Sequence, residues 1–264
     1  MATRNVNQQD TMATADDLSI SEEEEADESS MTLVEHLEEL RWRILKSLIA
    51  IVVGSIIAFI FRVQIMQFLT LPLPKAADSI THGKLAVTGL TEGFSVFLKL
   101  SIAAGFLIAL PVVLYQVWAF ISPGLYEREK KYAVPFIFIG IALFAAGIAL
   151  GFVVLQYPVQ WLVYFASSSF AELVTADSYF TFVAFFLLAF GIVFEIPLVL
   201  TFLAQIGLVT SQSLRRRRPA VYVGMWIAAT FLTPGADFYS PIILGVAMTI
   251  LFELTILFIR ITKH

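Results

Sequence analysis

The chain of 264 residues is 58% hydrophobic and 14% charged, with a mean hydropathy of +0.83. One soluble core cannot bury so many apolar side chains, which excludes a soluble globular protein and predicts an all-α integral membrane protein. The formal net charge is −4, and the absence of cysteine excludes disulfides, thiolate metal sites and cysteine nucleophiles.

The negative charge is concentrated at the N-terminus. Nine of the 21 acidic residues lie in the first thirty positions, where Arg4 is the only base. The remainder has 16 bases against 12 acids, a net charge of +4. Residues 1–31 are polar and have no apolar stretch like that of a signal peptide. We therefore expect a disordered acidic tail, followed by a membrane domain over residues 32–264.

Residues 32–43 have the pattern of an amphipathic helix at the edge of a membrane. Thr32 and Glu35 have the spacing of a capping box, so the helix is expected to begin at Thr32. Leucines at helical intervals form one apolar stripe, and charged residues occupy the remaining surface. The simplest interpretation is a solvated interface helix whose glutamates pair with Arg41 and Arg43.

Six apolar runs follow, and we interpret each as a transmembrane helix. A span needs about 20 residues to cross about 30 Å of hydrocarbon, so the last two runs are short. The fifth run is counted because Pro234 and Gly235, which follow it, indicate a tight turn between two helices. The runs cover about 44–61, 94–121, 132–157, 179–208, 220–232 and 241–259.

The flanking charges predict the orientation of these spans. With both termini in the cytoplasm, the inside segments hold twelve bases, and the outside segments hold only Arg62, Lys75, Lys84 and Lys99. Cytoplasmic loops carry an excess of Lys and Arg, so this bias and the even number of spans both predict cytoplasmic N and C termini. We interpret the four arginines at 215–218 as topology and lipid anchors.

Prolines within the runs predict the shape of the bundle. Pro111 and Pro197 lie deep in the second and fourth runs, and Pro135 lies near the start of the third. Because proline removes a backbone hydrogen bond and bends a helix, we expect six helices in a curved, cupped bundle.

Glu195 is the only ionisable residue well inside a run, since Lys46, Lys99 and Glu253 lie near run ends. A carboxyl group in hydrocarbon normally faces a partner, a wet cavity or another protein. One interpretation is a protonated group that is hydrogen-bonded within the bundle. The other is a polar recognition point for something that enters the bilayer.

Short motifs occur in a fixed order over residues 31–260. They are His36-Leu-Glu-Glu-Leu-Arg41, Pro72-Leu73, Tyr115-Gln-Val-Trp-Ala-Phe-Ile-Ser-Pro-Gly-Leu-Tyr126 with Glu129-Lys130-Lys131, Phe190-Gly-Ile-Val-Phe-Glu-Ile-Pro197, Leu214-Arg-Arg-Arg-Arg-Pro219, and Leu232-Thr-Pro234 with Asp237. In this order the motifs closely resemble the TatC family, the multispanning core of the twin-arginine protein translocase.

The resemblance implies a signal-peptide receptor and assembly core rather than an enzyme, with no cofactor, no metal and no catalytic residue. Members of that family bind twin-arginine signal peptides of folded precursors and recruit the single-span partners TatA and TatB, or a bifunctional TatA. Export uses the proton-motive force. For this chain the resemblance implies a multi-pass protein of the cell inner membrane that is oligomeric, contacts membrane lipid and binds no nucleic acid.

The resemblance also implies roles for particular residues. They are signal-peptide binding for Glu39, Arg41, Phe120 and Glu129, contact with a partner or the signal peptide within the membrane for Gln116 and Glu195, and family positions in the outside loops for Pro72 and Asp237. Gly235 and Ala236 precede Asp237 where many members place an aspartate nearer the proline, so the chain departs from the family around its last two spans.

Carboxylates suit the expected ligand. Two adjacent arginines present two planar guanidinium groups, and each is suited to bidentate binding by a carboxylate. Glu39 and Glu129 both lie on cytoplasmic segments in the expected topology, so they are the candidate receiving pair. Glu127 is the nearest alternative to Glu129.

Two other classes of protein fit the sequence less well. A six-span secondary transporter would have internal repeats and several polar groups at mid-membrane, whereas only Glu195 is central here. An intramembrane hydrolase would need histidines or paired aspartates within its spans. His36, His82 and His264 lie outside the runs, and no His-Glu-x-x-His motif occurs.

Overall fold

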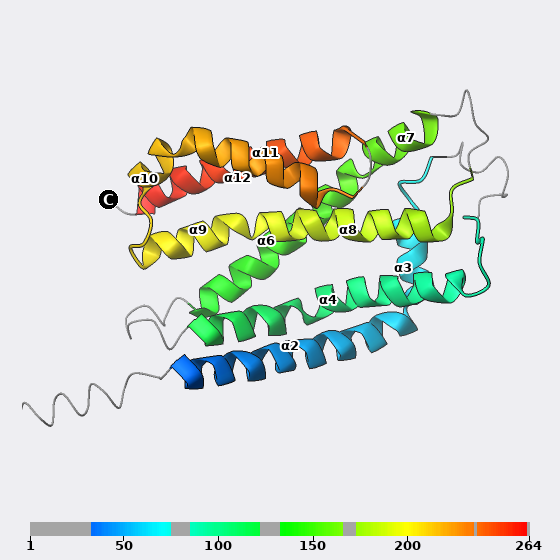
Figure 1. The fold of residues 1–264 in the computed structure, drawn as a ribbon, viewed down its shortest axis with the longest axis horizontal. Coiled ribbons are helices and arrows are strands. Elements are labelled where there is room, and N and C mark those ends of the chain that lie inside the picture. Colours follow the sequence, from blue (N-terminus) through cyan, green and yellow to red (C-terminus); the bar gives the residue numbers. More distant parts are fainter. Residues whose placement is uncertain (1–32, 75–84, 122–132, 166–172, 235–236, 263–264) are drawn as a thin grey trace, which may run out of the picture. The chain divides into compact units, whose positions relative to one another are not determined.

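The computed structural model describes residues 33–74, 85–121, 133–165, 173–234 and 237–262, so the acidic tail and Thr32 lie outside the described residues. Two compact units make up the chain, Met1–Leu45 and Lys46–His264. Regular structure in the described ranges is helical, apart from a parallel bridge between Ala86 and Thr175. The helices, labelled in Figure 1, are α2 (Leu33–Ile60), α3 (Arg62–Leu69), α4 (Glu92–Ile121), α6 (Ala133–Val154), α7 (Gln156–Phe165), α8 (Ala176–Phe194), α9 (Ile196–Gln205), α10 (Ser211–Arg216), α11 (Arg218–Leu232) and α12 (Tyr239–Thr262).

Five helical segments of the described chain are long and apolar enough to cross a membrane, and they make this an all-α membrane protein. They are Val34–Ile60, Glu92–Ile121, Val134–Phe165, Ala176–Gln205 and Tyr239–Ile261. The fifth predicted run forms α11, which has 15 residues and is about 22 Å long at the usual helical rise. The prediction that this run is short is confirmed. The same prediction for the last run is wrong, because α12 extends beyond the apolar run at both ends and has 24 residues, enough to cross a membrane.

The third predicted run extends further than the sequence indicated. Its predicted end at residue 157 is wrong, because the chain continues as α7 to Phe165. Pro158 is the third residue of α7, where a backbone N–H has no partner within the helix. The proline therefore lies in the first turn of a new helix and does not end the apolar segment.

The other prolines act differently from one another. Pro197 lies in the first turn of α9, directly after the break from α8 at Glu195. Pro111 lies inside α4, which nevertheless runs as one helix from Glu92 to Ile121. A helix break therefore occurs next to Pro197, while α4 continues past Pro111.

Helix α8 is central to the Lys46–His264 unit. Its side chains Phe180, Phe186 and Phe190 are fully buried. Helices α4 and α12 lie on either side of α8 in Figure 1, and α6 runs obliquely across it. Gly147 permits this crossing, since a Cβ atom at this position would lie 2.6 Å from the carbonyl oxygen of Phe190. The helices are therefore held by close packing of small residues against aromatic ones, as in other membrane bundles.

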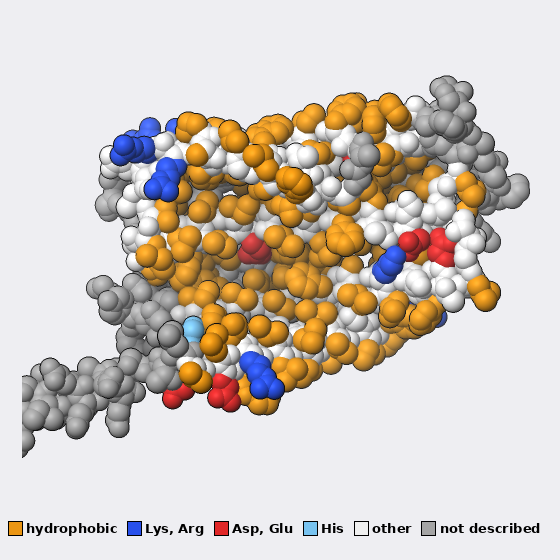
Figure 2. All heavy atoms as spheres, viewed as in Figure 1, with side chains coloured by type: hydrophobic (Ala, Val, Ile, Leu, Met, Phe, Trp, Pro, Cys, Tyr) orange, Lys and Arg blue, Asp and Glu red, His pale blue; other side chains and the backbone are white. Residues whose placement is uncertain are grey.

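The surface of the molecule is largely apolar. Figure 2 shows hydrophobic side chains across most of one face, with charged side chains mostly toward its edges. Many large aliphatic and aromatic residues of the described helices are exposed, for example Val52, Phe138 and Ile250. In water such a surface would aggregate, so the structure agrees with a protein whose helices face lipid.

Candidate functional site

Glu39 lies in α2, within the Met1–Leu45 unit, and already binds a guanidinium group. Its Oε1 accepts hydrogen bonds from Nε of Arg43 at 2.9 Å and from Nη2 of the same side chain. Nδ1 of His36 lies 3.8 Å from the second oxygen, Oε2, which is buried and accepts no hydrogen bond from a described residue. The helix thus presents a half-buried carboxylate with one oxygen bonded to an arginine four residues along.

The remaining residues predicted to bind the signal peptide are placed only in part. Arg41 is exposed and forms no hydrogen bond or ion pair with a described residue, so the predicted pairing of a glutamate is confirmed for Arg43 alone. Phe120 is half-buried in the last turn of α4. Glu129 and its alternative Glu127 lie outside the described residues, so the proposed pair of carboxylates stays a prediction.

Glu195 lies where α8 ends and α9 begins, within one of the long apolar segments. Its carboxyl group faces α6 at Gly140, because a Cβ atom on that glycine would lie 3.3 Å from Oε2 of Glu195. The same Cβ atom would meet Leu114 of α4 and Leu198 of α9. The carboxyl group is therefore surrounded by apolar side chains at a point where a glycine makes room for it.

The hydrogen bonds of Glu195 are incomplete. Its Oε1 is buried and has no hydrogen-bond partner among the described residues. An unpaired polar atom in an apolar setting destabilises the fold by about 1–3 kcal/mol. The interpretation of Glu195 as a group satisfied within the bundle is thus not supported at this oxygen.

An aromatic cluster joins the helices next to Glu195. The ring of Trp118 in α4 lies 5.0 Å from that of Phe136 in α6 and 4.7 Å from that of Phe202 in α9, measured between centroids. Gln116, predicted to contact a partner within the membrane, is buried two residues before Trp118. Sequence reasoning missed the cluster because the three rings come from separate helices, with no shared motif to link them.

Polar contacts that the sequence did not predict join the starts of α4 and α8. Nζ of Lys99 lies 2.6 Å from Oδ1 of Asp177, although the two residues are 78 positions apart. Glu92 accepts hydrogen bonds from the backbone and hydroxyl of Thr88, and from the backbone N–H of Asp177 at 3.3 Å. These contacts fix the segment around Ala86, whose N–H and carbonyl bond to Val174 and Ala176.

The two positions predicted in outside loops are at least partly buried. Pro72 is half-buried just after α3, near Leu69, whose carbonyl accepts a hydrogen bond of 2.7 Å from Tyr179. Asp237 is 6% exposed and accepts hydrogen bonds from the backbone N–H and the hydroxyl of Ser240, at 2.6 and 2.8 Å. This is the pattern of a helix N-cap, so Asp237 stabilises the start of α12.

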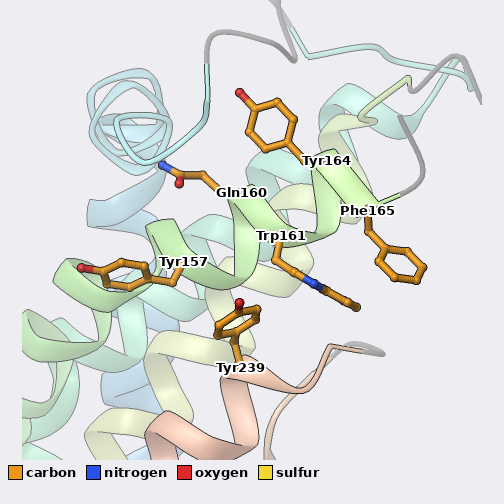
Figure 3. Close-up of a pocket in the computed structure, with 6 residues that line it drawn as sticks. All are labelled: Tyr157, Gln160, Trp161, Tyr164, Phe165 and Tyr239. Carbon is orange, nitrogen blue, oxygen red and sulfur yellow. The ribbon is translucent and has the colours of Figure 1, made fainter. Parts of the chain in front are cut away.

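The two ends of the Lys46–His264 unit differ in chemistry. At the α10 end, Glu253 of α12 accepts hydrogen bonds from Arg218 and from the hydroxyl of Tyr222, both in α11. At the α7 end, Figure 3 shows Trp161 of α7 close to Tyr239 at the start of α12, while Tyr164 points away from it. Trp161 lies 4.9 Å from Phe238 and 6.1 Å from Tyr239, between ring centroids. Trp and Tyr gather at membrane surfaces and bases flank spans, so both ends match interfaces of a bilayer.

This geometry defines a polytopic α-helical membrane protein with a carboxyl group, that of Glu195, at a helix break inside a long apolar segment. Within that class, a family model described as Sec-independent protein translocase protein (TatC) matches residues 35–247. The chain therefore belongs to the TatC family and is a membrane component of the Sec-independent, or twin-arginine, protein translocase.

Relatives and solved structures agree with this family. The chain is 37% identical over 236 residues to the Sec-independent protein translocase protein TatC of Desulforapulum autotrophicum, covering 89% of this chain and 86% of the relative. It is 35% identical over 238 residues to that of Carboxydothermus hydrogenoformans, covering 90% and 96%. A crystal structure of Twin Arginine Translocase Receptor TatC is similar with a TM-score of 0.74 and 32% identity, covering 87% of this chain and all of the other.

Proposed function

We propose that this chain is the signal-peptide receptor and assembly core of a twin-arginine translocase. It exports folded proteins across an energy-transducing inner membrane with the proton-motive force, and it acts without chemistry of its own. It recruits TatA-type and TatB-type single-span partners and works as an oligomer. Membership of the TatC family supports this function, as does the similarity to a solved structure described as a twin-arginine translocase receptor.

The observation that carries the receptor proposal is the contact between Glu39 and Arg43. The carboxylate of Glu39 holds a guanidinium group through two of its nitrogens. A twin-arginine signal peptide presents the same guanidinium group. The charge and setting of the Glu39 carboxylate therefore suit that ligand. In the proposed site, Glu39 and Glu129 each bind one of the two arginines, with Arg41 and Phe120 completing the surface.

Glu195 supports a second contact, within the membrane. Its Oε1 has no partner among the described residues, and the carboxyl group lies beside Gly140 at a helix break. A polar group in this setting is stabilised when another molecule supplies a hydrogen bond. We propose that Glu195, with Gln116, contacts a partner helix or the inserted signal peptide.

The proposed topology has six spans and cytoplasmic termini. Helix α11 is the short fifth span, and the basic segment at α10 lies in the cytoplasm, in agreement with the excess of Lys and Arg in inside loops. In this orientation Glu39 and Glu129 lie on the side where precursors are made, and Pro72 and Asp237 lie on the outer side.

Photocrosslinking to a twin-arginine precursor tests the proposed function. A photoreactive residue placed beside the two arginines of the precursor should label the chain, and Glu39→Ala or Glu129→Ala should lower labelling at least about tenfold. That size follows from losing a charged hydrogen bond of about 1.5–3 kcal/mol. A photoreactive residue at position 195 should label the precursor or a TatA- or TatB-type partner.

The matched control is Glu38→Ala, which removes the same charge from an exposed position on the same helix. Labelling should persist in this variant. Undiminished labelling in both Glu39→Ala and Glu129→Ala would overturn the proposed site, as would an equal loss in Glu38→Ala.

A further inference from the structure

A groove with a volume of about 460 Å³ lies between α10 and α11 on one side and α12 on the other. Three arginines line it: Arg215 in α10, Arg218 in α11 and Arg260 in the last turn of α12. Glu253 is the one acidic residue among the lining residues. The groove therefore has a net charge of +2.

The positive charge of the groove is not compensated within the described chain. Arg218 pairs with Glu253, whose other oxygen accepts a hydrogen bond from Tyr222, so both oxygens of this carboxylate are occupied. Arg215 and Arg260 are exposed and form no hydrogen bond or ion pair with a described residue. Two guanidinium groups thus face the groove without a counter-charge, which suits a ligand with a negative charge.

The wall of the groove along α12 is apolar. Ile250, Leu254 and Leu257 line it at helical spacing, and each is more than half exposed. Arg260 follows Leu257 by three positions and continues the same face of the helix. Because α12 is one of the membrane-spanning candidates, this stripe runs from the arginines along the direction in which lipid chains extend.

We propose that this groove binds one anionic phospholipid. Its phosphate lies between Arg215 and Arg260, and an acyl chain lies along Ile250, Leu254 and Leu257. Basic pockets between transmembrane helices are a recurring setting for acidic lipid headgroups. The position of this lipid in the cytoplasmic leaflet rests on the topology in the proposed function, whereas its binding does not.

Lipid binding to the purified full-length chain in detergent micelles tests the proposal. Native mass spectrometry is used to titrate the protein with phosphatidylglycerol and, in parallel, with phosphatidylcholine of the same chains. The chain should prefer phosphatidylglycerol. Replacing both free arginines, Arg215→Gln with Arg260→Gln, should weaken phosphatidylglycerol binding roughly thirtyfold, because each arginine near a lipid phosphate contributes about fivefold.

Arg216→Gln with Arg217→Gln is the matched control. It makes the same change in net charge, one and two positions beyond Arg215, at residues that do not line the groove. Phosphatidylglycerol binding should persist in this control, and both variants should keep their helical circular dichroism. Equal losses in the two double variants would overturn the proposal, as would equal binding of the two lipids.

Soluble glycerol phosphate distinguishes a lipid from a free anion. At millimolar concentration it should not displace phosphatidylglycerol, since it lacks the acyl chains that contact α12. Effective displacement would show that the groove binds free phosphate groups and would overturn the lipid assignment. None of these measurements involves a precursor, so their failure leaves the proposed receptor function untouched. Failure of the precursor crosslinking experiment likewise leaves the lipid proposal untouched.

Discussion

Arg43 competes with any outside arginine for the carboxylate of Glu39. Both residues lie on α2, four positions apart. Oε1 of Glu39 accepts two hydrogen bonds, from Nε and from Nη2 of Arg43. In the proposed site, a guanidinium group from a signal peptide must therefore displace Arg43 or uncover Oε2, which is buried and accepts no hydrogen bond from a described donor. In the proposed site, the internal pair orients the carboxylate when no peptide is present, and breaking this pair offsets part of the free energy gained on binding a peptide.

Arg43→Gln should consequently strengthen binding of a twin-arginine peptide. Pairs of this spacing contribute about 0.3–1 kcal/mol, so an increase in affinity of roughly two- to fivefold is expected. Fluorescence anisotropy of a labelled signal peptide with the purified protein measures the change. Lys46→Gln is the control, because it removes one positive charge from an exposed position on the same helix. Weaker binding by Arg43→Gln would mean that Arg43 contributes to the site instead of competing for it.

At the scale of the helices, glycines decide which pairs approach closely. A Cβ atom on Gly147 of α6 would collide with the backbone and side chains of α8. Gly54 of α2 and Gly105 of α4, both in the Lys46–His264 unit, are in similarly close contact. Gly224 of α11, by contrast, has nothing within 4 Å of its Cβ position. A glycine in the sequence does not reveal which of these cases applies.

Gly147→Ala should therefore destabilise the protein, whereas Gly224→Ala should not. The first forces α6 away from α8 and should destabilise the protein by about 1–3 kcal/mol, as overpacked sites do. The second only improves helix propensity in open space and should be neutral or stabilise by up to about 1 kcal/mol. Unfolding midpoints of the two variants in one detergent compare them. Equal midpoints would show that α6 and α8 do not pack closely at Gly147.

The effect of a proline on a helix depends on its position in that helix. Pro158 and Pro197 each lie in the first turn of a helix, where the absent N–H is not needed. Pro111 lies in the interior of α4 without ending it. The sequence shows where each proline stands, but whether it starts a helix or is accommodated inside one depends on the packing of the neighbouring helices.

At the scale of the whole molecule, α11 decides the number of spans. It is too short to count by length alone, yet it packs along α12 and its N-terminal end lies beside the four arginines. If α11 crosses the membrane, its two ends face opposite sides and six spans result. If α11 does not cross the membrane, the segments before and after it lie on the same side of the membrane.

Single cysteines test this topology cleanly because the chain contains none. With a membrane-impermeant thiol reagent on intact cells, Phe238→Cys should be labelled, and Gln212→Cys should be protected until the cells are lysed. Leu90→Cys, at a fully exposed position before α4, is the outside control. Labelling of residues 212 and 238 from the same side would show that α11 does not span.

The sequence by itself determined the class of protein, the approximate positions of its helices and its family. Hydropathy and run length depend on local composition, and a series of motifs such as that from His36 to Asp237 needs no coordinates to be read. The sequence also singled out Glu39 and Glu195 before any contact was known.

Only the tertiary structure decided what these residues touch. The pairing of Lys99 with Asp177, the apolar surroundings of Glu195 and the groove between Arg215 and Arg260 all depend on packing between segments. Such contacts join positions tens of residues apart and are set by the fit of whole helices. No local sequence pattern predicts them, because each contact forms, and stabilises the fold, only when two distant helices pack together.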